Sequence, residues 1–158
     1  LRYPASRMTM SLLVRLAHVD DLAAIQSLDH TARSSAQRRC FITHAVEADV
    51  CFVAEASRQV IGYGVMEYKF FDNGFLEMLY VHPEHRRLGV GSSILKHIES
   101  ACRTAKLFTS TNLSNLPMQA LLIRAGFHLC GTVHGLDPGD PELFYLKQRD
   151  DGLTTGGS

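Results

Sequence analysis

The hexapeptide Arg86-Arg87-Leu88-Gly89-Val90-Gly91 carries the residue types that bind a phosphate group through the main chain. It follows a strand-like run at residues 75–81 and precedes an amphipathic stretch that begins at Val90. The first amides of a helix have no partner inside the helix and lie at the positive end of its dipole. Glycines let an anion approach these amides, and the two arginines offer charged hydrogen bonds to a pyrophosphate. The segment therefore predicts a phosphate-binding loop at a helix N-terminus.

Two common phosphate-binding loops do not fit this segment. A dinucleotide fold would place a third glycine three residues after Gly91, where this chain has Ile94. A nucleoside-triphosphate loop would place a lysine directly after its last glycine, where this chain has Ser92. A different phosphate-bearing ligand is therefore expected, unless the glycines serve only turn geometry and the arginines are plain surface charges.

The segment from Val81 to Gly91 resembles the acetyl-CoA pyrophosphate loop of the GCN5-related N-acetyltransferase (GNAT) superfamily, which reads Arg/Gln-x-x-Gly-x-Gly/Ala. A second block, Asn115 to Phe127, resembles the helix that follows in this family. The blocks occur in the family's order, and the resemblance spans nearly the whole chain. It implies a mixed α/β (α+β) fold, in which a twisted, mainly antiparallel central sheet of about six to seven strands has helices on both faces.

The resemblance also assigns the contacts to acetyl-CoA, the expected acyl donor. It gives the pantetheine arm to the main chain of Leu79, Tyr80 and Val81, a strand that must part from its neighbour so that its free amides and carbonyls face the ligand. Asn115 takes a side-chain contact near the pantetheine, and it is equally suited to be the N-cap of the following helix. The resemblance assigns the pyrophosphate contacts to Arg86, Arg87, Leu88, Gly89, Val90, Gly91 and Ser92.

Glu77 is the one acidic residue in the run 75–81 and is the candidate catalytic residue. Strand alternation predicts that it shares a face with Phe75, Leu79 and Val81, among apolar neighbours. Burial there would raise the pKa of its carboxyl and suit it to accept a proton from an ammonium substrate. A glutamate holds the same place in polyamine and aminoglycoside members of the family. The alternative is a solvated glutamate on the strand face, or one paired with an arginine.

The chain departs from the family pattern at the general acid. Many members carry a tyrosine seven residues after the asparagine, and that position is Leu122 here. Tyr80 and Tyr145 are the substitutes, although strand tyrosines commonly just pack. The acid therefore stays unassigned, while activity is still expected because a CoA thiol needs little help to leave at neutral pH.

Cysteines and histidines point to neither a metal site nor a covalent intermediate. The cysteines stand far apart, so we expect reduced, inert core thiols in a cytoplasmic protein, with a disulfide as the alternative. They are Cys40, Cys51, Cys102 and Cys130. No histidine pair has the helical spacing of a zinc site, and we expect no metal. The histidines considered are His82, His85, His128 and His134.

Length and charge favour one domain that binds small or locally recognised partners. The chain has 158 residues, and its sixteen basic and sixteen acidic residues cancel, which argues against nucleic acid or an anionic membrane as partner. No apolar run approaches the ~20 residues of a membrane span. We expect the catalytic domain at residues 11–149, an N-terminal extension at 1–10 and a flexible tail at 150–158, and we leave open whether the protein forms a homodimer.

Periodicity and turn residues predict the elements that position these motifs. The predicted strands lie at residues 12–16, 51–55, 60–68, 75–81, 107–109, 127–133 and 143–147. A first helix is capped by Asp20 or Asp21, and a second spans residues 35–48. A third carries an apolar stripe from Val90 to Ala105, and a fourth has Pro117 in its first turn and ends at Gly126.

The sequence as a whole predicts an acyl-CoA-dependent N-acyltransferase that moves acetyl from acetyl-CoA to a primary amine by direct attack in a ternary complex. The alternative is a non-catalytic CoA-binding sensor or interaction module of the same fold. The acceptor stays open between a small amine and a protein N-terminus or lysine, and longer acyl groups stay open because the loop recognises phosphates only. Three carboxylates lie near the expected entrance for the acceptor: Asp137, Asp140 and Glu142. They would either attract a cationic amine or merely stabilise a turn.

Overall fold

The computed structural model describes residues 11–149; the predicted extension and tail lie outside the described residues. The strands are β1 (Leu12–Leu16), β2 (Cys51–Ala56), β3 (Gln59–Phe70), β4 (Asn73–Val81), β5 (Lys106–Asn112), β6 (His128–Val133) and β7 (Glu142–Gln148). The α-helices are α1 (Leu22–Leu28), α2 (His30–Ser34), α3 (Ala36–Glu47), α4 (Val90–Ala101) and α5 (Leu116–Arg124). Two short 3-10 turns are η1 (Val19–Asp21) and η2 (Pro83–His85).

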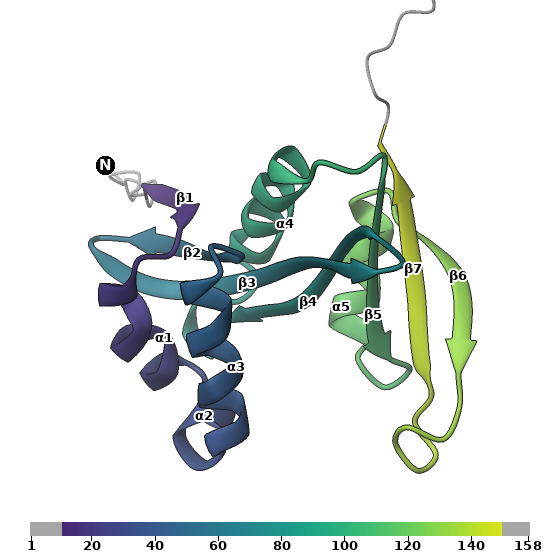
Figure 1. Ribbon diagram of the computed structural model, residues 1–158, viewed down its shortest axis with the longest axis horizontal. Coiled ribbons are helices and arrows are strands. Elements are labelled where there is room, and N and C mark those ends of the chain that lie inside the picture. Colours follow the sequence, from purple (N-terminus) through teal and green to yellow (C-terminus); the bar gives the residue numbers. More distant parts are fainter. Residues whose placement is uncertain (1–10, 150–158) are drawn as a thin grey trace, which may run out of the picture.

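The seven strands form one sheet in the order β1-β2-β3-β4-β5-β7-β6. Every neighbouring pair is antiparallel except β4 and β5, which are parallel. A parallel pair needs a crossover, and α4 provides it between the two strands (Figure 1). The predicted mixed α/β fold with a mainly antiparallel sheet is confirmed.

Strands β4 and β5 pair over only three residues and then part. The paired residues are Gly74 with Leu107, Phe75 with Phe108, and Leu76 with Thr109. Beyond Leu76, strand β4 runs on to Val81 without a partner on this side, whereas β5 stays paired with β7 as far as Asn112. The predicted separation of the 79–81 segment from its neighbouring strand is therefore confirmed.

Helices cover both faces of the sheet, as predicted. On one face, Ile94 and Ile98 of α4 and Leu122 of α5 are fully buried in a common core with residues of the sheet. On the other face, α1, α2 and α3 pack against β2, β3 and the end of β4. Glycines make the first packing possible, because a Cβ on Gly62 or Gly64 would lie only 2.8–3.1 Å from side-chain atoms of α4.

The helix predictions hold, with three corrections. Asp21 directly precedes α1, but its side chain makes no capping hydrogen bond there and instead accepts one from the His18 amide and pairs with Arg15. The second predicted helix is α3, whose N-cap Ser35 accepts a hydrogen bond from the Arg38 amide. The sequence analysis missed α2, a five-residue helix too short for periodicity to reveal, whose first amides bind the buried Asp29 carboxylate. The apolar stripe predicted as far as Ala105 is too long, since α4 ends at Ala101.

Two hairpin turns consist of consecutive residues in the left-handed region. Ser57 and Arg58 join β2 to β3, with φ values of 50° and 63°. Phe71 and Asp72 join β3 to β4, with φ values of 50° and 60°, so β4 begins at Asn73, two residues before the predicted start at Phe75. Two left-handed residues match the right-handed twist of a hairpin.

No helix among residues 11–149 is long and apolar enough to cross a bilayer.

Candidate active site

The loop between β4 and α4 presents unpaired main-chain amides at a helix N-terminus. Gly89 is the N-cap of α4, with a φ of 81° that favours glycine. No side chain caps this helix, and the amides of residues 87–92 form no hydrogen bond within the described part of the chain. The positive end of the helix dipole and these free donors together favour an anion.

A cleft of about 660 Å³ lies between this loop, the unpaired end of β4 and helix α5. All the predicted cofactor residues except one line it: Leu79, Tyr80, Val81, Arg86, Arg87, Gly89, Val90, Gly91, Ser92 and Asn115. The exception is Leu88, which is 60% exposed and lies outside the lining. The structure thus brings together residues that span 37 positions of the sequence, from 79 to 115.

Helix α5 adds lining residues that the sequence analysis missed. Pro117, Leu121 and Arg124 line the cleft at the spacing of one helix face, which was a usable signal. Asn115 begins this helix, and its Oδ1 accepts a hydrogen bond from the Met118 amide at 3.3 Å. The N-cap role of Asn115 is confirmed, and its position on the cleft leaves the second role available.

Gly91 leaves open space toward the cleft. A Cβ at this position would meet only ordinary contacts at 3.5–4.0 Å, with the side chains of Leu121, Val81 and Leu79. Packing within the protein therefore does not require glycine here. The missing side chain instead leaves room for a ligand close to the main chain, which fits the predicted phosphate approach.

The two arginines of the loop differ in their surroundings. The Arg86 Nε donates to the Val81 carbonyl at 2.9 Å, and its guanidinium lies 5.7 Å from the centre of the Tyr80 ring. Arg86 is therefore held against the end of β4 with its terminal nitrogens still available. Arg87 is exposed and has a φ of 61°. Both side chains line the cleft.

Glu77 is exposed, so its predicted burial among apolar neighbours is wrong. The physical reason is a β-bulge: Val65 pairs with Met78 and Met66 pairs with Leu76, which leaves Glu77 as an extra residue of β4. The bulge breaks the alternation on which the prediction rested. Leu76 accordingly packs into the same core as Leu79 and Val81, although strict alternation would have separated them.

The electrostatic surroundings of Glu77 still favour a proton acceptor. Neighbouring atoms partly desolvate the carboxyl and raise its pKa, the charge of Glu67 raises it further, and Lys69 opposes both effects. The predicted direction of the pKa shift and its main cause are thus correct, although the side chain is exposed and the contribution of Glu67 on β3 was not predicted. A carboxylate with a raised pKa accepts a proton more readily than an ordinary glutamate.

The residues considered for the general acid differ in burial and in whether they line the cleft. Leu122 is fully buried, and Tyr145 is a core residue with 4% exposure, so neither reaches the cleft. Tyr80 lines the cleft, and its hydroxyl lies 3.4 Å from His30 Nδ1. Of the two substitute tyrosines, only Tyr80 lines the cleft, and its side chain packs toward the core under α1–α3.

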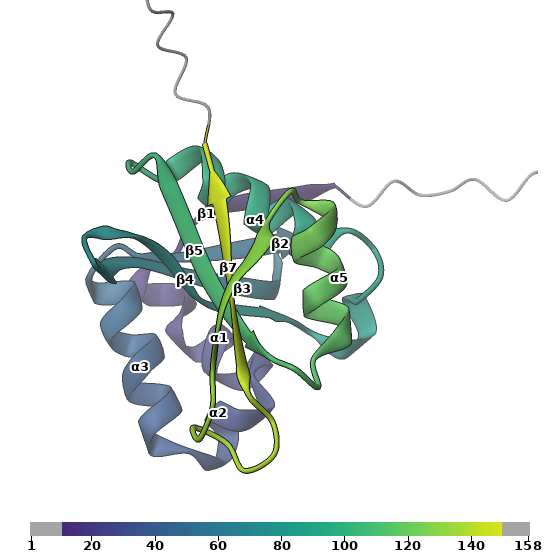
Figure 2. The same cartoon turned by 90° about the vertical axis from the view of Figure 1, so that its right-hand side faces the viewer.

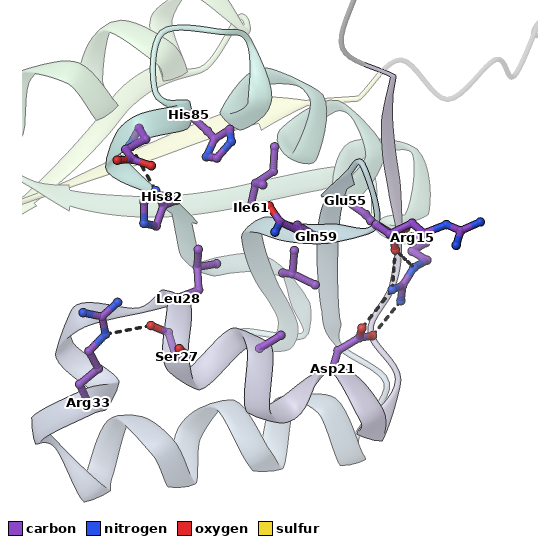
Figure 3. Close-up of a pocket in the computed structure, with 14 residues that line it drawn as sticks. Arg15, Asp21, Ser27, Leu28, Arg33, Glu55, Gln59, Ile61, His82 and His85 are labelled. Carbon is purple, nitrogen blue, oxygen red and sulfur yellow. Dashed lines mark hydrogen bonds and ion pairs between the residues drawn. The ribbon is translucent and has the colours of Figure 1, made fainter.

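A second cleft, of about 540 Å³, lies on the other side of η2 (Figure 3). At one end, Arg15 is paired with Asp21 at 2.8 Å and with Glu55 at 2.9 Å. At the other end, the Arg33 Nε donates to the Ser27 carbonyl at 2.9 Å. Arg15, Asp21 and Glu55 are thus paired with one another, and none of the predicted cofactor residues lines this cleft.

The four cysteines are all free thiols. Cys51 and Cys102 are buried as expected, whereas Cys40 and Cys130 are exposed, so the core-thiol prediction is wrong for these two. Burial raises the pKa of Cys51 to about 12, which keeps it a neutral and weakly nucleophilic thiol near neutral pH. Within residues 11–149, no three side chains of the metal-binding types come together.

The carboxylates of the loop between β6 and β7 serve local structure. Asp137 accepts a hydrogen bond from Asn112 Nδ2 at 2.9 Å. Asp140 accepts two from Ser114, through its amide at 2.9 Å and its hydroxyl at 2.5 Å. These bonds tie the loop to the segment between β5 and α5, which favours the turn interpretation for both residues.

Comparisons with known proteins agree with this geometry. The family model described as "Acetyltransferase (GNAT) family" matches residues 18–127. A GNAT-family acetyltransferase from Bacillus cereus ATCC 10987 is 34% identical, with a TM-score of 0.83 over 88% of this chain and 98% of its own. No relative among the curated proteins matches the chain.

Two more distant structures share the fold. The yncA protein of Salmonella typhimurium, solved with its cofactor acetyl-CoA, is 20% identical with a TM-score of 0.71, over 93% of this chain and 99% of its own. The ribosomal-protein-S18-alanine N-acetyltransferase of Escherichia coli is 18% identical with a TM-score of 0.73, over 91% and 98%.

Proposed function

Because the chain belongs to the acetyltransferase (GNAT) family, we propose that it transfers acetyl from acetyl-CoA to a primary amine by direct attack in a ternary complex. The observation that carries this proposal is the cleft itself. Free amides at the N-terminus of α4 and an unpaired strand edge line one continuous cavity. The first feature suits a pyrophosphate, and the second suits an extended chain that contains amide groups.

The proposed binding roles follow from these two features. The amides of residues 87–92 and the terminal nitrogens of Arg86 and Arg87 bind the pyrophosphate. The main chain of residues 79–81 pairs with the amides of the pantetheine arm, as an added strand would. The acyl group then lies toward the closed end of the fork between β4 and β5, just beyond their last pair, Leu76 and Thr109.

Glu77 is the proposed general base for the transfer. It takes a proton from the ammonium of the acceptor, directly or through a water molecule. The freed nitrogen lone pair forms a bond to the acyl carbon, and the nitrogen then gives its second proton to water. The carbon–sulfur bond breaks, and the sulfur leaves with its electron pair. Tyr80 is the proposed source of a proton for that sulfur, because it is the one of the two substitute tyrosines that lines this cleft.

The proposed compartment is the cytoplasm. Cys40 and Cys130 are exposed free thiols, which fits a reducing environment better than an oxidising one. None of the four cysteines takes part in the proposed transfer, because direct attack needs no nucleophile from the enzyme.

A panel of primary amines incubated with acetyl-CoA tests this function. The expected result is CoA release that depends on the amine, with a mass gain of one acetyl group on the amine. Calorimetry of CoA binding accompanies the assay and separates two failures. Tight CoA binding without consumption by any amine, peptide N-terminus or lysine peptide would replace the enzyme with the alternative, a non-catalytic CoA-binding module. Absence of CoA binding would remove the cleft assignment as well.

A further inference from the structure

Five phenylalanines form an aromatic surface, which we call the phenylalanine platform: Phe70, Phe71, Phe75, Phe108 and Phe144. The Phe70 ring is at its centre, with ring centroids 4.8 Å from Phe75, 5.1 Å from Phe108 and 5.8 Å from Phe144. Phe70, Phe75, Phe108 and Phe144 are each only partly buried. Rings brought together from β3, β4, β5 and β7 remain in contact with solvent.

The platform lies on a part of the sheet that no described helix covers. Leu107, Leu143 and Tyr145 are buried toward α4 and α5, so the alternating residues Phe108 and Phe144 face the opposite way. On that opposite face, the core under α1–α3 contains residues of β2, β3 and β4 but none of β5–β7. Figure 2 shows β5, β7 and β6 in the foreground without a helix in front of them.

The platform adjoins the closed end of the fork between β4 and β5. Phe75 pairs with Phe108 in the ladder, one step before Leu76 and Thr109, the last pair of β4 and β5. Under the proposed function, the acyl group lies at this closed end. An acceptor resting on the platform would therefore have its reactive end near the acyl carbon.

The ammonium group of Lys69 already contacts a carboxylate beside the platform. Lys69 Nζ lies 2.5 Å from Glu67 Oε2, and Glu67 pairs with Phe75 in the ladder. The Glu67 side chain is only 13% exposed, whereas the Lys69 side chain is 81% exposed. A mostly buried carboxylate is thus neutralised by a lysine that can swing into solvent. Glu77 is close enough for both charges to act on its carboxyl.

Phe71 adds a feature that packing alone does not explain. Its side chain is 84% exposed, and its φ of 50° is costly for a bulky residue. Asparagine or glycine would normally occupy such a turn position. The exposed ring packs edge-on against Phe70 at 5.1 Å, which extends the platform to its outer margin. Local strain at an exposed aromatic residue points to a role in binding.

We infer that the acceptor is an amine with a single ammonium on an aromatic or similarly flat apolar body. Its ammonium replaces that of Lys69 beside Glu67 and Glu77, and its body rests on the phenylalanine platform. An acceptor with a carboxylate in place of the ammonium is excluded, because two glutamates would repel it. The inference rests on the proposed function only in placing the acyl group at the closed end of the fork between β4 and β5.

Binding of three probes to the CoA-saturated protein tests this inference without requiring turnover. The probes are phenethylamine, butylamine and hydrocinnamate, and calorimetry measures their affinities. Phenethylamine is expected to bind about tenfold more tightly than butylamine, because stacking and cation–π contacts add to the ionic contact. Hydrocinnamate, which has the ring but carries a carboxylate, is expected not to bind. Equal affinity for the two amines, or binding of hydrocinnamate, would overturn the inference.

Variants separate the parts of the site. Phe71→Asn and Phe144→Ala should weaken the binding of phenethylamine but not of butylamine. Phe71→Asn also removes backbone strain, and circular dichroism checks that both variants fold. Lys69→Ala should tighten both amines severalfold by removing the competing ammonium, whereas Lys96→Ala, an exposed lysine on α4, should change neither. Weaker amine binding in Lys69→Ala would contradict the exchange of ammonium groups.

Turnover distinguishes this inference from the proposed function. A protein that acetylates many amines with no preference for an aromatic body retains the proposed function and loses this inference. A protein that binds phenethylamine as described but never acetylates it retains the binding site and loses the proposed function.

Discussion

Thr109 and Leu76 fix the point where β4 and β5 part. They are the last pair of the two strands, and the Thr109 Oγ1 donates a hydrogen bond to the Leu76 carbonyl at 2.9 Å. Thr109 is 1% exposed, so water does not compete for this bond. One buried hydroxyl therefore ties the two strands together at the closed end of the fork between them.

Thr109→Val removes this hydrogen bond and keeps the shape of the side chain. We expect the free energy of unfolding to fall by about 1 kcal/mol and turnover to fall with it, because the closed end loosens. Urea denaturation and steady-state kinetics measure the two effects. Thr111→Val is the matched control, since Thr111 is buried on the same strand and its hydroxyl has no hydrogen-bond partner among the described residues. Equal losses in both variants would show that the bond is unimportant.

Gly91→Val tests the phosphate loop. The new side chain meets only ordinary protein contacts but fills the space in front of the free amides, so the protein should fold and lose CoA binding. Calorimetry with CoA measures the loss, and circular dichroism checks the fold. Gly131→Val, on the exposed strand β6, is the control because nothing lies within 4 Å of its added Cβ. Undiminished CoA affinity in folded Gly91→Val would remove the loop assignment.

Glu77→Gln tests the general base. It should lower turnover by roughly 10²- to 10⁴-fold near neutral pH while CoA binding stays intact. Because the pKa of the Glu77 carboxyl is raised, wild-type activity should decline as pH falls toward that pKa, from a higher pH than for an ordinary glutamate. The loss in the variant should shrink as pH rises, since free amine then becomes abundant.

The pH–rate profiles of wild type and Glu77→Gln measure these effects. Glu47→Gln, an exposed glutamate at the end of α3, serves as the control. Unchanged turnover of Glu77→Gln near neutral pH would leave Glu77 without a role in proton transfer.

Much of this site could be predicted from the sequence because its main parts are local. The loop at residues 86–92 lies between one strand and one helix, so chain order alone brings its glycines and arginines together. The position of α5 on the cleft was also partly readable, from Asn115 and the Pro117 turn. Short-range patterns of this kind depend on capping and turn chemistry, which single residues reveal.

Other features depend on how neighbouring strands pair, and the alternation of side chains along a single strand does not reveal that pairing. The bulge that exposes Glu77 appears only when β3 and β4 are paired. The phenylalanine platform joins four strands, and its members are separated by as many as 74 positions, from Phe70 to Phe144. The Lys69–Glu67 pair lies beside the platform because Glu67 pairs with Phe75 on the neighbouring strand.

Asp21→Asn tests the ionic link between β1, η1 and β2. The Arg15 guanidinium, together with a hydrogen bond from the His18 amide, lowers the pKa of the Asp21 carboxyl below 3.8. A lowered folded-state pKa contributes stability that is present above the unfolded pKa and is lost as pH falls through the folded value. Near neutral pH we expect Asp21→Asn to cost about 1 kcal/mol, after allowance for solvent screening of this partly exposed pair.

The difference between wild type and Asp21→Asn should vanish in acid, once the wild-type carboxyl is itself protonated. Urea denaturation of both proteins at a series of pH values, from neutral down to well below the usual carboxyl pKa, measures this convergence. A stability difference that stays constant across this range would show that Asp21 acts through packing and not through its charge.

The most direct measurement of the central claim is a mass-spectrometric balance of one reaction mixture that contains the protein, acetyl-CoA and a primary amine. The account predicts one acetylated amine for each CoA released, with no acetyl group on the protein, since none of its thiols is needed as a nucleophile. The same mixture with Gly91→Val should release no CoA above background. Acetyl-CoA that binds but is never consumed, or an acetyl group trapped on a cysteine before the amine is added, would contradict the account.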